Sequence, residues 1–344
     1  MIAQWLSLCQ KIIASNLGTL RAPYKLTYAV TSECHSRCAN CSIWQKPPRD
    51  ELTLEELTSL AKNSPFLSWI DFTGGEPTAR RDLVQIVTAF LEHCPALTAV
   101  HFPTNGLNPR RVEGIAREIA LRHPPRFVIS VSIDGPPEIN AQLRGRADAF
   151  QSAVETYQRL KALDGVSVYV GMTLFKENAA LLDETVAAIS ALIPSFSFAD
   201  LHVNLPHTSE HYYGNNGQDY RATPQIGEAF KKLMAERGAA WRPMDRLERM
   251  YHKQVQTYLS TRTCPQKCAA IFASCFLSED GMVFPCSIWN APLGNIREHG
   301  YSLLGPLRSR QAQELRTKLL AKDCPNCWTP CEAYQTLLAN LLRC

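Results

Sequence analysis

Between residues 25 and 205 the sequence alternates between short apolar segments typical of strands and longer segments with helical periodicity. The expected strands are Lys25–Thr31, Trp69–Thr73, Ala99–Pro103, Phe127–Ile133, Val166–Leu174 and Leu201–Leu205. One expected helix begins at the capping box of Thr53 and Glu56. The others occupy Asp82–Cys94, Pro109–Arg122, Ala149–Leu163 and Leu181–Ile193. Strands that alternate with helices assemble into a parallel sheet with right-handed crossovers. The pattern therefore predicts an α/β fold with its functional loops at the carboxyl ends of the strands.

The distribution of the 13 cysteines argues against a secreted, disulfide-bonded protein. They gather toward the two ends of the 344 residues, and Cys94 alone lies between Cys41 and Cys264. A protein held together by disulfides is usually shorter, and its cysteines are spread more evenly along the chain. Clustered thiols in a reducing compartment therefore indicate bound metal instead. We therefore expect a cytoplasmic protein.

Charge and hydropathy argue against two further classes of protein. The 36 basic and 32 acidic residues give a formal net charge of +4, too balanced for a typical nucleic-acid-binding protein. The longest apolar run, Val186–Ile193, is far shorter than the roughly 20 residues that span a bilayer.

Met1–Leu17 has the spacing of an amphipathic helix and lacks the unbroken apolar core of a signal peptide. We expect this helix to pack on the main domain, and association with a membrane surface is the alternative.

Three cysteines lie close together just after the first expected strand. Cys34, Cys38 and Cys41 have the spacing C-x3-C-x2-C. Three thiolates on one short loop can bind three irons of a [4Fe–4S] cluster and leave the fourth iron open to another ligand. A structural zinc ion is the alternative, although zinc usually takes four protein ligands.

This spacing resembles that of the radical S-adenosylmethionine (SAM) enzymes, and further motifs follow in the order that this superfamily shows. Gly74, Gly75, Glu76 and Pro77 end the second expected strand and match the GGEP motif of these enzymes. The resemblance implies a partial (β/α)6 TIM-like barrel, a [4Fe–4S] cluster with an open iron, and bound SAM. It also implies a set of SAM-binding residues: Gly74, Gly75, Glu76, Asn105, Ser132 and Arg144.

Some of these residues receive a specific role from the resemblance. The two glycines permit close backbone approach to a ligand, and Glu76 would accept a hydrogen bond from the ammonium group of SAM. Ser132 would contact the ribose, and Arg144 would contact the carboxylate. A simple Asp-Gly turn after Ser132 and a surface position for Arg144 are the alternatives. The residue before the third cysteine, often aromatic in these enzymes, is Asn40 here.

A second group of cysteines lies in the last 80 residues. Cys268 and Cys286 are expected to flank a β-hairpin that turns at residues 280 and 281, and Cys324 and Cys327 follow it. The region resembles the SPASM and twitch extensions of radical SAM enzymes, which carry auxiliary iron–sulfur clusters. The resemblance implies that these four thiolates bind one auxiliary [4Fe–4S] cluster, with Cys331 as an alternative ligand. A zinc ribbon is the rival interpretation, and three further cysteines are held in reserve: Cys264, Cys275 and Cys344.

The expected domain organisation has four parts. They are an amphipathic helix at 1–23, a radical SAM core at 24–220, a helical linker at 221–263 and a small cysteine-rich α+β domain for the auxiliary cluster at 264–344. No membrane-spanning segment and no nucleic-acid partner are expected.

The resemblance also implies a function. SAM would be cleaved reductively to a 5′-deoxyadenosyl radical that abstracts hydrogen from a C–H bond and so modifies or oxidises a peptide or a small molecule. An external donor such as flavodoxin or ferredoxin would supply the electron. A lipid or isoprenoid substrate is the alternative within the family, and a non-enzymatic iron–sulfur or zinc protein is the alternative outside it. No catalytic residue is assigned, and the polar candidates for substrate contact are His101, His202, Asn204 and His207.

Overall fold

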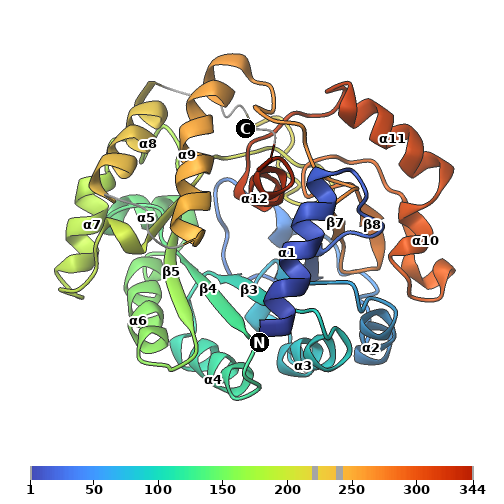
Figure 1. Cartoon of the computed structure of the whole chain (residues 1–344). Coiled ribbons are helices and arrows are strands. Elements are labelled where there is room, and N and C mark those ends of the chain that lie inside the picture. The colour runs from blue at the N-terminus through green and yellow to red at the C-terminus, as the bar shows by residue number, and fades with distance from the viewer. Residues whose placement is uncertain (1, 219–223, 238–242, 343–344) are drawn as a thin grey trace.

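The computed structural model describes residues 2–218, 224–237 and 243–342, so Met1 and Cys344 lie outside the described residues. Its centre is a parallel sheet with helices on both sides (Figure 1). The six parallel strands of the core are β1 (Lys25–Thr31), β2 (Trp69–Gly74), β3 (Ala99–Thr104), β4 (Arg126–Ser132), β5 (Ser167–Thr173) and β6 (Leu201–Asn204). All six expected strands are present, within two residues at each end. The α/β architecture and the partial barrel are confirmed.

Helices connect these strands and continue beyond them. They are α1 (Ile2–Asn16), α2 (Leu54–Lys62), α3 (Leu83–His93), α4 (Pro109–Ala120), α5 (Pro137–Arg144), α6 (Ala149–Lys161), α7 (Leu182–Ser190), α8 (Pro224–Glu236), α9 (Pro243–Thr261), α10 (Leu304–Leu307), α11 (Arg310–Leu320) and α12 (Pro330–Leu338). The capping box that begins α2 is confirmed, since Thr53 and Glu56 each accept the other's backbone N–H. The sequence analysis did not predict α5, α10, α11 or α12.

The C-terminal strands extend the core sheet. Strand β7 (Ser274–Leu277) runs parallel to β1, and β8 (Met282–Phe284) and β9 (Gly294–Asn295) follow it in antiparallel pairs. The resulting sheet has nine strands in the order β6-β5-β4-β3-β2-β1-β7-β8-β9. The predicted hairpin turn is confirmed, with Gly281 at a φ of 88°, where a side chain would be strained. The cysteine-rich region is therefore joined to the barrel by backbone hydrogen bonds.

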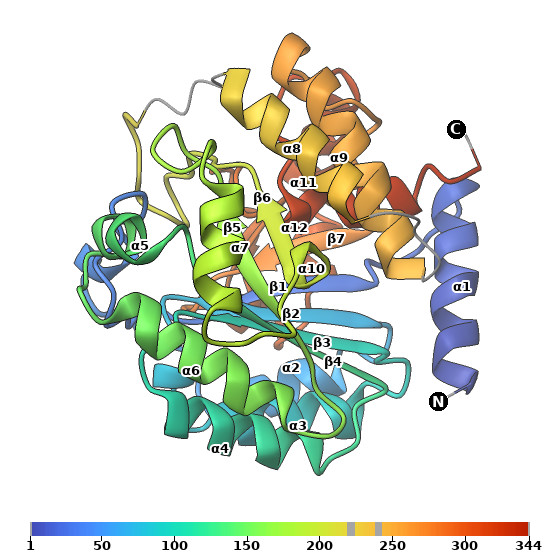
Figure 2. The same ribbon diagram turned by 90° about the vertical axis from the view of Figure 1, so that its left-hand side faces the viewer.

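The two faces of the sheet differ in burial. Along β3, β4 and β5 buried and half-buried residues alternate, as a strand with one covered face requires. The buried side chains, such as Phe102, Ile129 and Val170, belong to the main core cluster, and the helices α3, α4 and α6 lie along this side of the sheet (Figure 2). We call the other side the inner face. Its half-buried side chains include His101, Ser130, Ser132, Tyr169 and His202.

The N-terminal helix packs on the main body, as the sequence analysis expects. Leu8 and Ile12 of α1 contact a small cluster that includes Tyr24, Ala273 and Ala339. Asn16 at the end of α1 donates a hydrogen bond to the carbonyl of Leu338, which fastens the helix beside the C-terminal segment (Figure 2). The opposite side of α1 is exposed and apolar. Within the described ranges, no helix has the length and apolar character needed to cross a bilayer.

Candidate active site

The loop with three cysteines lies at the carboxyl end of β1. Cys34, Cys38 and Cys41 are all partly exposed, and the Cys38 thiol is near enough to act electrostatically on both Cys34 and Cys41. Burial is the main cause that raises the pKa of Cys34 to about 11 and that of Cys41 to about 12. The Cys34 and Cys41 thiols therefore hold their protons in the metal-free protein and must release them when iron binds.

Two donors from outside this loop, one just after β3 and one at the end of α5, point at its sulfur atoms. Asn105 Nδ2 lies 3.9 Å from Cys34 Sγ, and Arg144 Nη1 lies 3.9 Å from Cys38 Sγ. Hydrogen bonds to ligating sulfur stabilise the thiolate form and tune a bound metal centre. The loop thus fits a thiolate-ligated iron–sulfur cluster.

Three glycines let the backbone of the cysteine loop lie against its neighbours. A Cβ on Gly74 would overlap the carbonyl oxygen of Thr31, and a Cβ on Gly75 would overlap that of Glu33. Gly145, directly after Arg144, has a φ of 68° and would overlap the carbonyl oxygen of Arg37 in the same way. The sequence analysis explains the GGEP glycines by a ligand. The structure adds a second reason, which is their contact with the chain around the cysteines.

We expect Gly145→Ala to impair cluster assembly. The substitution puts a side chain at a left-handed position, which costs about 1–2 kcal/mol, and it also displaces the loop that carries Cys38. Gly114→Ala in α4 is the matched control, because nothing lies within 4 Å of its Cβ and alanine favours a helix by about 0.5–1 kcal/mol. Iron per chain after anaerobic reconstitution and the melting temperature are the measurements. Equal iron content in both variants would contradict the role of Gly145.

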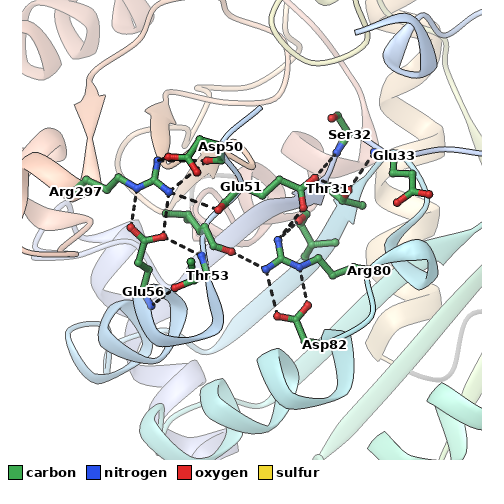
Figure 3. Close-up of polar contacts among 12 residues, drawn as sticks. Thr31, Ser32, Glu33, Asp50, Glu51, Thr53, Glu56, Arg80, Asp82 and Arg297 are labelled. Atoms are coloured by element: carbon green, nitrogen blue, oxygen red, sulfur yellow. Dashed lines mark hydrogen bonds and ion pairs between the residues drawn. The ribbon is translucent and has the colours of Figure 1, made fainter. Parts of the chain in front are cut away.

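An ion-pair network holds the chain at the entrance to the cysteine loop (Figure 3). Glu51 accepts hydrogen bonds from the Thr31 hydroxyl at 2.5 Å and the Ser32 N–H at 3.3 Å. Its other oxygen lies 3.1 Å from Arg80 Nη1, and Arg80 also pairs with Asp82 at 2.7 Å. The first residues after β1 are therefore fixed to the segment that begins α3.

The C-terminal region is tied to the same area (Figure 3). Arg297 Nε lies 2.7 Å from Glu56 Oε1, and its Nη1 lies 3.0 Å from Asp50. The Arg297 hydrogen bond is the main cause that lowers the pKa of Glu56. The capping residue of α2 thus also joins the barrel to the cysteine-rich region.

Glu76 of the GGEP motif is buried and accepts four hydrogen bonds. Oε1 accepts from the Thr78 N–H at 3.2 Å, the Thr78 hydroxyl at 2.5 Å and the Thr104 hydroxyl at 2.8 Å. Oε2 accepts from the Asn105 N–H at 2.7 Å. Burial raises the pKa of Glu76 above its ordinary value despite these donors. Glu76 therefore fastens the end of β3, and with it Asn105, beside the cysteine loop.

Arg144 is not at the surface, so the alternative of a surface arginine is wrong. Its side chain is 16% exposed, and Nε lies 2.7 Å from Oδ2 of Asp134. Asp134 is buried and accepts the Thr173 N–H at 2.8 Å. The guanidinium thus lies between this carboxylate and Cys38. The sequence analysis did not identify Asp134 as the partner of Arg144, although its position two residues after β4 was a signal for it. Ser132 lies half-buried at the end of β4 on the inner face.

The four C-terminal cysteines proposed as ligands come together in the structure. Burial is the main cause that raises the pKa of Cys286, Cys324 and Cys327, and the nearby Cys268 thiol raises the pKa of all three further. Cys264 also belongs to this group, because it shares a side-chain hydrogen bond with Cys268. These residues come from the segment before β7, the end of β8 and the loop before α12.

Cys331 and Cys275 have different surroundings. The carbonyl of Cys331 accepts a hydrogen bond from Lys25; burial is the main cause that raises the pKa of its thiol to about 11, and the charged neighbours that act on it are Lys25, Asp71 and Glu332. Cys275 is buried in β7, where Glu332 is the charged neighbour of its thiol.

Across the described residues, no three side chains of His, Cys, Asp or Glu converge on a point that suits a single metal ion. An iron–sulfur cube does not require such convergence, because each of its irons takes a thiolate of its own.

The histidines named as candidates for substrate contact have different environments. His207 accepts the Trp328 N–H at 3.1 Å and so holds the loop after Cys327, and burial lowers its pKa to about 4. His202 lies 3.3 Å from Glu248 and packs against Tyr169, and burial lowers its pKa to about 3. Asn204 ends β6 half-buried, and His101 lies on the inner face.

A buried ion pair lies on the inner face. Lys25 is fully buried, and its Nζ lies 3.0 Å from Asp71 Oδ2 and donates to Gln335 Oε1 at 3.2 Å and the Cys331 carbonyl at 2.5 Å. Burial alone would raise the pKa of Asp71, but Lys25 and His101 hold it well below its usual range. Helix α12 is therefore anchored to the amino-terminal parts of β1 and β2.

We expect Lys25→Met to destabilise the protein by about 3–5 kcal/mol, because Asp71 would keep a buried charge without its ammonium partner. The double variant Lys25→Met/Asp71→Asn should recover part of this loss. Lys161→Met is the control, since the pair of Lys161 with Asp200 is exposed and contributes about 0–1 kcal/mol. Urea unfolding of the reconstituted protein measures all three, and a loss in Lys25→Met no larger than in the control would contradict the prediction.

Comparison with protein families places this geometry in a known group. The family model described as "Radical SAM superfamily" matches residues 28–189, and a model described as "Iron-sulfur cluster-binding domain" matches residues 268–328. The chain therefore contains a radical SAM domain followed by a SPASM domain. Members of this superfamily are enzymes that use a [4Fe–4S] cluster and SAM, and the SPASM domain at the C-terminus carries auxiliary iron–sulfur centres. The hypothesis of a non-enzymatic protein is therefore wrong.

Two curated radical SAM proteins illustrate the relationship. The sporulation killing factor maturation protein SkfB of Bacillus subtilis is 25% identical over 307 residues, which cover 88% of this chain and 68% of SkfB. The mycofactocin maturase MftC of Mycobacterium tuberculosis is 29% identical over 206 residues, which cover 56% of this chain and 50% of MftC. The chain thus spans between half and about two thirds of these relatives.

Solved structures share the fold. A structure of anSMEcpe with bound AdoMet and a peptide has a TM-score of 0.60 and 16% identity, and the match covers 93% of this chain and 97% of that one. Streptococcus suis SuiB bound to its precursor peptide SuiA has a TM-score of 0.59 and 13% identity, with 97% and 76% covered. These likenesses confirm the radical SAM architecture.

Proposed function

We propose that this radical SAM enzyme removes a hydrogen atom from a C–H bond of a peptide and thereby modifies or oxidises the peptide. The observation that carries the proposal is the inner face of the sheet, on which half-buried polar side chains of β3–β6 gather. SkfB and MftC, which match the chain, are named as maturases of a killing factor and of mycofactocin. The structures of anSMEcpe and SuiB each hold a peptide.

Each group of residues has a proposed task. Cys34, Cys38 and Cys41 would bind three irons and leave the fourth for SAM, whose amino and carboxylate groups would be met by Glu76 and Arg144. When bound, the cluster and SAM supply a 5′-deoxyadenosyl radical that takes the hydrogen atom. Cys268, Cys286, Cys324 and Cys327 would bind the auxiliary cluster. The division at residues 23, 220 and 263 into helix, core, linker and auxiliary domain is part of this proposal, as is an external donor such as flavodoxin or ferredoxin.

A deuterium-transfer experiment tests the substrate class. The reconstituted protein is incubated with SAM and dithionite in three separate mixtures, which contain perdeuterated peptides, perdeuterated sugars and alcohols, or a perdeuterated lipid extract. We expect 5′-deoxyadenosine to gain one deuterium with the peptides alone, because the radical takes the atom directly from the substrate. Deuterium from the sugars and alcohols would support a small-molecule substrate, and deuterium from the lipids would support a lipid substrate. Either result would contradict the peptide proposal.

A further inference from the structure

Three polar side chains of neighbouring strands form a continuous chain of contacts on the inner face. Asp71 Oδ1 in β2 lies 3.2 Å from His101 Nδ1 in β3, and His101 Nε2 lies 3.0 Å from Ser130 Oγ in β4. This is the order and spacing of an acid, an imidazole and a hydroxyl that act together in proton transfer. We propose that Asp71, His101 and Ser130 are a proton relay in which Ser130 takes a proton from an O–H, N–H or S–H group of the bound peptide.

The register of the sheet brings these residues together. Asp71 and His101 are direct partners in the pairing of β2 with β3. His101 pairs with Val128 of β4, and Ser130 follows Val128 by two residues, so it lies on the same face one step further along the strand. Sequence positions 71, 101 and 130 are thus neighbours only in the folded sheet.

Asp71 is held as an anion and so orients the imidazole. Its Oδ1 also accepts the Trp69 indole N–H at 2.7 Å, and its Oδ2 pairs with Lys25 at 3.0 Å. An anionic acceptor at Nδ1 favours the tautomer with the proton on Nδ1, which leaves Nε2 free to accept from the Ser130 hydroxyl. This tautomer is assigned from the hydrogen-bond partners. The relay therefore points outward from the buried carboxylate.

Asp71 is the most deeply buried of the three residues. The side chain of Asp71 is 10% exposed and that of His101 is 26% exposed, and Ser130 is half-buried. The other titratable groups around the imidazole are Lys25 and Glu332 beyond Asp71, and Tyr169 and His202 on β5 and β6. Arg126 at the start of β4 also lies near this group, burial lowers the pKa of His202 to about 3, and Asp71 is the anion that contacts His101.

The relay lies where a substrate would meet the cofactor. Ser132, the proposed ribose contact, is two residues beyond Ser130 on the same face of β4, a separation of roughly 7 Å along the strand. Ser130 is thus one step deeper in the barrel than the SAM site. The inference rests on the proposed function in this respect, since it assumes that the peptide lies on the inner face.

The chemical step is a proton transfer without any change in redox state. The X–H bond of the peptide breaks heterolytically and its electron pair stays on X. The proton passes to Ser130 Oγ while the hydroxyl proton of Ser130 passes to His101 Nε2. The imidazolium that results is stabilised by the Asp71 carboxylate. A peptide that loses a hydrogen atom and is then oxidised must also lose a proton, and this relay would receive it.

Covalent labelling of Ser130 tests the relay without a substrate. The reagent is diisopropyl fluorophosphate. Ser130 Oγ would attack its phosphorus atom, fluoride would leave, and the hydroxyl proton of Ser130 would pass to His101. We expect one adduct on Ser130 of the reconstituted protein, lost in Ser130→Ala and slowed roughly 100-fold or more in His101→Gln and Asp71→Asn. His93→Gln in α3 is the matched control and should label at the wild-type rate. No adduct on Ser130, or equal rates in His101→Gln and wild type, would overturn the proposal.

Nitrogen-15 spectra of the histidines give a second readout. We expect His101 in the oxidised, reconstituted protein to carry its proton on Nδ1, and Ser130→Ala to shift the resonance of Nε2. A proton on Nε2 would overturn the relay, because that nitrogen could not accept from Ser130. Neither measurement uses a substrate, so the relay can be overturned while peptide modification stands. The deuterium experiment can in turn contradict peptide modification while the labelling of Ser130 is unchanged.

Discussion

Replacing Cys34, Cys38 or Cys41 by alanine is expected to abolish the formation of 5′-deoxyadenosine from SAM in the presence of dithionite. Each iron of the open cluster depends on one of these thiolates, and the loop around them offers no further cysteine. Iron should fall from about eight to about four per chain, because the C-terminal group of cysteines is remote in sequence and keeps its own cluster. Chromatography of the nucleosides and an iron assay measure the two effects.

Cys9→Ser is a suitable control for this experiment. Cys9 is exposed on α1, away from both groups of cysteines, so its loss should leave both iron content and SAM cleavage unchanged. A variant of the three-cysteine loop that still cleaves SAM at the wild-type rate would remove that residue from the ligand set. The buried Asn105 and Arg144 donors would then need another explanation.

Changing Cys324 and Cys327 together to alanine is expected to separate radical formation from substrate turnover. Iron should fall from about eight to about four per chain, since two of four ligands of the auxiliary cluster are lost. Slow cleavage of SAM should survive, because the loop after β1 is intact. Turnover of the peptide should fail, because the oxidation would lack its internal electron acceptor.

Metal analysis of the same preparations also tests the rival zinc ribbon. About four irons and one zinc per chain in the wild-type protein would make the C-terminal site a structural zinc site. Cys331→Ala is the matched control for the double variant. We expect it to keep about eight irons, because Cys331 lies with Lys25 and Asp71, apart from the other thiols. A loss of iron in Cys331→Ala would instead make Cys331 a ligand.

Much of the barrel could be predicted because its signals are local. The strand Lys25–Thr31 is reproduced to the residue, and the capping box at Thr53 begins α2 where the sequence places it. Alternating burial and end-capping chemistry are properties of a few consecutive residues. Three of the missed helices, α5, α10 and α12, are short or begin at a proline, whereas α11 has neither property. Helix α5, for example, has eight residues and begins at Pro137, so it offers little periodicity to detect.

The site was predictable as a set of residues but not as a set of contacts. Motif spacing identified the three-cysteine loop, the GGEP turn and Arg144. It could not pair Arg144 with Asp134, since that contact depends on how α5 turns back over β4. Nor could it separate Cys331 from the other C-terminal cysteines, because the start of α12 directs it toward Lys25, more than 300 residues earlier in the chain.

The sequence by itself determined the order of strands and helices, the carboxyl-end position of the motifs and the family of the chain. Each of these depends on residue types at short, fixed spacings. The tertiary structure alone decided which inward side chains meet across the sheet. The chain from Asp71 through His101 to Ser130 exists because parallel pairing places three strands in one register, and a shift of one residue would turn each side chain to the other face.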